Sequence, residues 1–87
     1  MLSAQQIAAQ ADFLQAKRFL AQLRAEREHL AGQLSTQVTK LNAGPSRLSD
    51  EEARSLRGAI RYLEANIRQL DRMLEGLERR FPEAVSR

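Results

Sequence analysis

His29 is the residue best suited to acid–base or metal chemistry in this chain of 87 residues. An imidazole serves as a metal ligand or general base only when further ligands or an orienting group stand beside it. The chain has no cysteine and no second histidine, and Glu26 and Glu28 point to different faces of a helix. We therefore expect His29 to be a surface residue, and we expect no catalytic residue, no metal ligand and no cofactor site.

The glycines give no phosphate-binding chemistry either. Loops that cradle phosphates are glycine-rich and connect a strand to a helix. Gly32, Gly58 and Gly76 instead stand singly within helical patterns, and we predict no strand. The sequence therefore predicts a protein that is not an enzyme and takes no small-molecule substrate.

A Gly44–Pro45 pair near the middle divides the periodic parts of the chain. Glycine commonly ends a helix in a left-handed conformation, and proline cannot continue one because it lacks the backbone N–H. Helices are therefore predicted over about 4–42 and 50–81, joined by a hinge at 43–49 and ended by Pro82. Within one domain, 1–87, this gives two long helices.

Each predicted helix opens with a serine followed three residues later by Gln or Glu. Ser3 precedes Gln6, and Ser49 precedes Glu52. In such capping boxes the serine hydroxyl accepts a free backbone N–H and the longer side chain reaches back to the N–H of the serine. These patterns support the predicted starts of both helices.

Apolar residues in both helices recur in alternating steps of three and four, which is the pattern of a coiled-coil seam. The fold class predicted is all-α, an antiparallel two-helix hairpin resembling a coiled coil. The expected hairpin core is Phe13, Leu20, Leu23, Leu30, Leu34, Leu56, Ile60, Leu63, Ile67, Leu70, Leu74, Leu77 and Phe81.

Folding the chain near residue 45 would place Leu23 opposite Ile67 and Ala9 opposite Phe81. Arg27 interrupts the apolar seam of the first helix. A guanidinium buried without a partner is costly, so we expect Arg27 to extend outward and meet Glu64.

The first helix has more apolar surface than one seam can use. A two-helix rod buries only one stripe of each helix, so the excess predicts a further contact. We expect a homodimer that forms a four-helix bundle, or a different protein partner; the sequence leaves both open. The expected partner-binding residues are Ile7, Ala11, Leu14, Lys17, Arg18, Arg61, Tyr62 and Arg68.

The formal charge of +3 and twelve arginines raise the possibility of a nucleic-acid partner. The basic residues are interleaved with acids, however, and residues 50–83 hold seven basic and eight acidic side chains. Glu64 and Glu75 each stand four residues before an arginine, the favoured order for a helical ion pair. Nucleic-acid binding through the arginines is therefore the alternative and not the main prediction.

No apolar run approaches the roughly 20 residues of a membrane span, and the first residues do not follow a signal-peptide pattern. We therefore expect a cytoplasmic protein without membrane contact. The main functional prediction is a small adaptor, chaperone or inhibitor that presents a helix face to a larger protein. Hairpins of this kind occur among bacterial and phage accessory proteins, although no family-specific motif is present.

Overall fold

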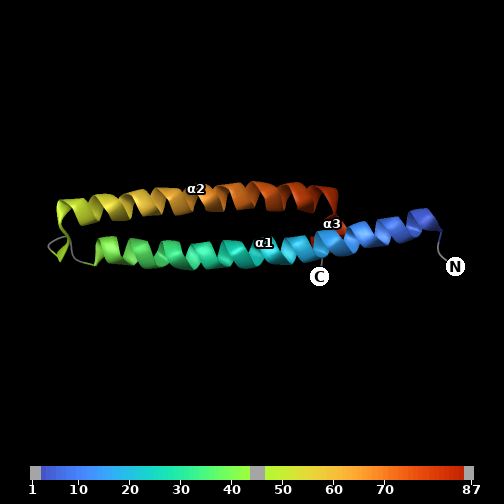
Figure 1. The fold of residues 1–87 in the computed structure, drawn as a ribbon, viewed down its shortest axis with the longest axis horizontal. Helices are drawn as coiled ribbons and strands as arrows, with labels where there is room; N and C mark the ends of the chain where they lie inside the picture. Colours follow the sequence, from blue (N-terminus) through green and yellow to red (C-terminus); the bar gives the residue numbers. More distant parts are fainter. Residues whose placement is uncertain (1–2, 44–46, 86–87) are drawn as a thin grey trace.

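The computed structural model describes residues 3–43 and 47–85. It contains α1 (Ala4–Asn42), α2 (Asp50–Arg80) and the short α3 (Pro82–Val85), and the described residues form no strand. Helices α1 and α2 run antiparallel and side by side, which gives a rod of 69 × 17 × 14 Å (Figure 1). The chain is an all-α helical hairpin, as the sequence predicted.

The first helix begins with the predicted capping box, whereas the second has only half of one. The Ser3 hydroxyl accepts the Gln6 N–H at 3.2 Å, and the Ser3 N–H donates to Gln6 Oε1 at 2.9 Å. The Ser49 hydroxyl accepts a hydrogen bond from the Glu52 N–H at 3.1 Å. Between these two described residues, the Ser49 N–H does not donate to the Glu52 side chain. The starts at 4 and 50 are nevertheless as predicted, because one serine cap already satisfies an unpaired N–H of the first turn.

The predicted end of the second helix was one residue too far. Helix α2 ends at Arg80, and Phe81 has the non-helical angles φ −130° and ψ 65°. A residue before proline is pushed out of the α region, whereas proline itself suits the first position of a helix. Pro82 therefore ends α2 and also begins α3, which turns toward α1 (Figure 1).

The core is a thin layer between α1 and α2. Its best-packed part joins Leu20, which is only 1% exposed, with Leu23 and Leu74. All thirteen residues expected in the core lie buried or half-buried. Ala16 and Leu63 are the other buried apolar residues in the described part of the chain.

The register of the two helices differs from the expected one by a heptad. Leu23 packs with Leu74 rather than Ile67, and Leu30 lies beside Leu70. A slip of seven residues keeps every apolar position on the seam, so the periodic pattern fits both registers equally well. At the closed end the half-buried Leu48 lies with Leu56, and α2 begins beyond the end of α1 (Figure 1).

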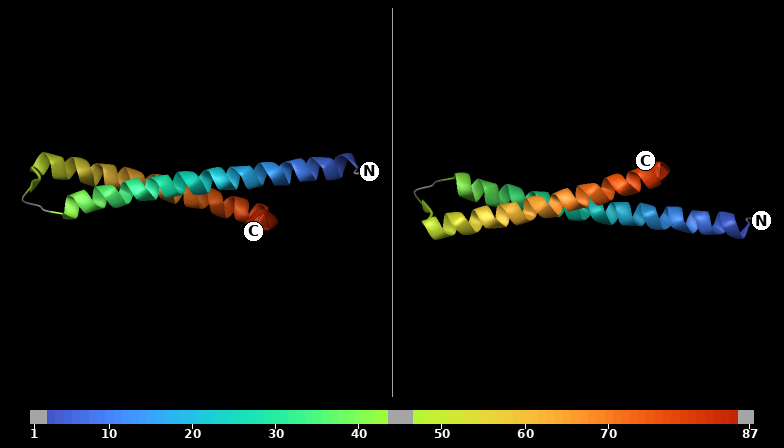
Figure 2. Two further views of the ribbon diagram at one scale, coloured as in Figure 1. Left: turned by 90° about the horizontal axis from the view of Figure 1, so that it is seen from below. Right: turned by 90° about the horizontal axis from the view of Figure 1, so that it is seen from above.

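Because of this register, the first turns of α1 project past the end of α2 (Figure 2). Residues 3–12 are all exposed. Ala9 is therefore not a core residue opposite Phe81; Ala16 lies near Phe81 instead. Because Ala16 takes the place predicted for Ala9, a small side chain still lies next to the bulky ring of Phe81.

Candidate interaction surfaces

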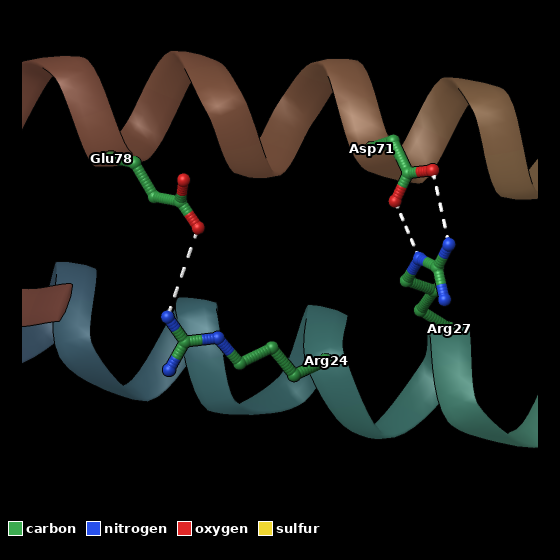
Figure 3. A network of polar contacts seen from close by, with 4 residues as sticks. All are labelled: Arg24, Arg27, Asp71 and Glu78. Carbon is green, nitrogen blue, oxygen red and sulfur yellow. Dashed lines mark hydrogen bonds and ion pairs between the residues drawn. The ribbon is translucent and has the colours of Figure 1, made fainter.

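One flank of the hairpin is bridged by two ion pairs (Figure 3). Arg27 of α1 donates to Asp71 of α2 through Nε–Oδ1 at 2.5 Å and Nη2–Oδ2 at 3.3 Å. Arg24 Nη2 lies 3.8 Å from Glu78 Oε1. Arg27 can occupy the seam because its guanidinium meets the carboxylate at the edge, where both groups remain partly hydrated.

The Arg27–Asp71 contact shifts the acid–base equilibrium of both groups toward their charged forms. The hydrogen bond from Arg27 lowers the pKa of Asp71, with some opposition from desolvation. The hydrogen bond and the charge of Asp71 raise the pKa of Arg27. Both side chains therefore stay ionised over the whole physiological range.

The expected partner of Arg27 was wrong by one heptad. Glu64, the predicted partner, stands seven residues before Asp71, and Glu78 stands seven residues after it. Residues seven apart lie on one line along a coiled-coil helix. An acid is therefore available to the arginines of α1 in either register, so charge pairing could not have identified the correct one.

The opposite flank carries a shallow hollow of about 500 Å³ near the open end of the hairpin. Phe19, which is 42% exposed, lines it together with Leu77 and Phe81. The guanidinium carbon of Arg80 lies 5.5 Å from the centre of the Phe81 ring and covers part of the apolar wall. The hollow is small and polar at its rim, and Arg80 already contacts its main aromatic residue.

An uncovered apolar surface lies on the side of α1 that faces away from α2. We call it the α1 outer face. Ile7 and Leu14 are its large residues, and they are 55% and 52% exposed. Small residues surround them, and Arg18 is the single charge. The α1 outer face comprises Ala4, Ile7, Ala11, Leu14, Arg18, Ala21 and Ala25, all exposed.

Helix α2 presents a basic surface on the side that faces away from α1. Tyr62, which is 70% exposed, lies among its arginines. The ion pairs expected from Glu64 and Glu75 are not formed; both ion pairs recorded among the described residues join α1 to α2. Exposed pairs gain little because ordering two long side chains costs entropy. The α2 outer face comprises Arg54, Arg61, Tyr62, Arg68, Arg72, Arg79 and one acid, Glu75.

The eight expected partner-binding residues are all exposed, and the structure separates them into two groups. Ile7, Ala11, Leu14, Lys17 and Arg18 lie near the projecting end of α1. Arg61, Tyr62 and Arg68 lie on α2, beside the second half of α1. The two groups face away from each other, so one partner helix cannot contact both.

Metal-binding clusters and membrane-spanning helices are absent from the described residues. His29 is exposed, and the described parts of the chain bring no three His, Cys, Asp or Glu side chains together as a metal site. Neither of the long helices contains a segment apolar enough to span a membrane within these residues. No protein-family model, curated protein or solved structure matches this chain.

Proposed function

We propose that this chain is a non-enzymatic interaction module that binds a protein partner through the α1 outer face. One observation carries the proposal. The hairpin leaves Ile7 and Leu14 more than half exposed on a side of α1 that α2 does not cover. Contiguous exposed apolar surface of this kind is typical of protein-binding sites.

The distribution of apolar residues around the two helices supports the same conclusion. Those of α2 are confined largely to the side that faces α1, as expected for a surface helix. The apolar residues of α1 occupy two opposite sides of the helix, and only one of the two sides packs on α2. A helix that is apolar on opposite sides is normally buried on both. A helix in the partner would cover the second side by the helix-in-groove mode of recognition.

Photo-crosslinking in the cells that make the protein tests the proposal. A photoreactive amino acid at Leu14 should give a discrete covalent adduct with a partner protein. Ser35 is the matched control because it lies on the same line of α1, is also exposed and stands in the polar half. The absence of an adduct at Leu14, or equal adducts at both positions, would contradict the proposal.

The α2 outer face supports a second candidate function, the binding of nucleic acid. Asp71 and Glu78 pair with arginines of α1 (Figure 3), so the outer arginines form no recorded ion pair with these two acids and outnumber the remaining acid of this face, Glu75. Titration with single- and double-stranded oligonucleotides at two salt concentrations tests it. Binding that weakens steeply with salt would favour this function, because neutralised phosphates release counterions.

A further inference from the structure

We infer that the α1 outer face binds a second copy of this chain, with the two α1 helices antiparallel and a two-fold axis near residues 12 and 13. This inference rests on the proposed function, because it names the partner of the same surface. Three observations carry it: the accessible area of the chain, the projecting end of α1, and the charges on the two outer faces.

The hairpin exposes far more surface than a compact chain of its size. Its accessible surface is 6991 Å². A compact folded chain of 9.9 kDa exposes about 5,200 Å². The excess of about 1,800 Å² is more than twice the roughly 800 Å² that each partner buries in an interface of standard size. The rod therefore has enough uncovered surface for a stable dimer.

The projecting end of α1 offers a surface that its own chain leaves uncovered. Residues 3–12 are exposed, and because they continue the long helix α1 and are capped by Ser3, they keep a helical apolar side that α2 does not cover. An antiparallel copy with its axis near residues 12 and 13 places 3–12 of one chain against 13–22 of the other. The latter segment is held by its own hairpin, since Ala16 and Leu20 are buried there. Each copy thus covers the exposed end of the other.

The residues of the α1 outer face fit this arrangement. Ala4, Ile7, Ala11, Leu14 and Arg18 follow one another in steps of three and four, which is a second seam on the same helix. In the antiparallel arrangement Leu14 of one copy meets the small Ala11 of the other. Ile7 meets the aliphatic part of Arg18, whose guanidinium extends to water. Large residues therefore meet small or flexible ones across the two-fold axis.

Charge determines both the orientation and the face used. In a parallel dimer the two Arg18 side chains would oppose each other at the seam, whereas the antiparallel arrangement separates them by about 16 Å along the axis. The α2 outer face carries five arginines against one acid, Glu75, so two copies would repel each other there. The α1 outer face has one charge and avoids this repulsion.

Light scattering coupled to size-exclusion chromatography tests self-association. The wild type should have twice the 9.9 kDa mass of the chain. The double variant Ile7→Glu, Leu14→Glu should have the mass of a single chain. It should keep a cooperative unfolding transition, because the Leu20 core lies on the other side of α1. The control Tyr62→Glu introduces one glutamate at an exposed position of α2 and should remain dimeric.

Single cysteines test the orientation without interference, since the natural chain has none. Ala11→Cys should form a disulfide between copies, and so should a mixture of Ala4→Cys and Ala21→Cys chains. Ala25→Cys should not, because antiparallel copies hold these positions about 37 Å apart, far beyond the roughly 7 Å limit between bridged Cα atoms. Efficient bridging at Ala25→Cys would overturn the antiparallel arrangement.

A monomeric wild type would overturn the inference altogether. If Leu14 then crosslinked to a different protein, the proposed function would stand and only the identity of its partner would change. A monomer without any Leu14 adduct would contradict both. The two tests therefore distinguish failure of the dimer from failure of the interaction module.

Discussion

Truncation of Leu20 should show how much the thin hairpin core contributes to stability. Leu20 is 1% exposed and packs with Leu23 and Leu74. Leu→Ala changes at such positions cost about 3 kcal/mol or more, since the lost transfer free energy is joined by the cost of a cavity. An 87-residue chain has a total stability of about 4–13 kcal/mol. Leu20→Ala should therefore remove a large part of it.

Urea denaturation followed by circular dichroism, at one fixed protein concentration, measures this effect. The fixed concentration matters because self-association would add to the apparent stability. In thermal denaturation, the same loss of about 3 kcal/mol would lower the midpoint temperature by roughly 12–24 °C in a domain of this size. Tyr62→Ala is the control, since Tyr62 is 70% exposed, and it should change the free energy of unfolding by less than about 0.5 kcal/mol. Equal effects of the two variants would refute the assignment of the core.

Three further predictions concern the helices and the ion-pair flank. Gly58→Ala and Gly76→Ala should each stabilise the protein by about 0.5–1 kcal/mol in urea denaturation, because no neighbouring atom lies within 4 Å of the added methyl group; destabilisation by either would show that the position is crowded. Ser49→Ala should cost about 0.5–2 kcal/mol through loss of the cap on α2, whereas Ser49→Asp should retain most of the stability; equal losses would argue against the cap. The lowered pKa of Asp71 means that its contribution is present above the unfolded-state pKa of about 3.9 and is lost as the pH falls through the folded-state value. Asp71→Asn should therefore lose less stability than the wild type on acidification, whereas Glu64→Gln, which removes a carboxylate without a recorded ion pair, should follow the wild type.

The elements of the fold could be predicted because their signals are local. Ser3 and Ser49 mark the starts of α1 and α2, and the seam from Leu56 to Leu77 has a regular heptad period. Helix α3 was missed because Pro82 signals the end of a helix as strongly as the first residue of another. Local chemistry therefore predicts the positions of the long helices better than the conformation of the residues after a proline.

The register could not be predicted, because both parts of its signal repeat every seven residues. The apolar seam does so, and so do the acids Glu64, Asp71 and Glu78. In the observed register Leu48 lies beside Leu56 at the closed end of the hairpin. Leu48 stands outside the periodic part of the sequence, so the heptad pattern did not predict this contact. This difference of one heptad in register explains why the predicted position of Ala9 and the predicted partner of Arg27 were both wrong.

The candidate surfaces could be predicted in part. The exposure of Ile7 and Leu14 follows from their position outside the seam, which the helical period already gives. The extent of the projecting end depends on the register, so the sequence did not show that residues 3–12 are uncovered by α2. The occupant of a surface depends on the shapes of two molecules, and one sequence describes only one of them.

The projecting end of α1, and with it the proposed interaction surface, depends on the register of the hairpin. Intramolecular disulfides between paired cysteines measure that register directly. Leu23→Cys with Leu74→Cys should close readily under mild oxidation in dilute solution, because these side chains pack together. Leu23→Cys with Ile67→Cys, a full heptad away, should remain reduced. The reverse result would place the end of α2 beside Ala9, cover most of the projecting segment and contradict the account.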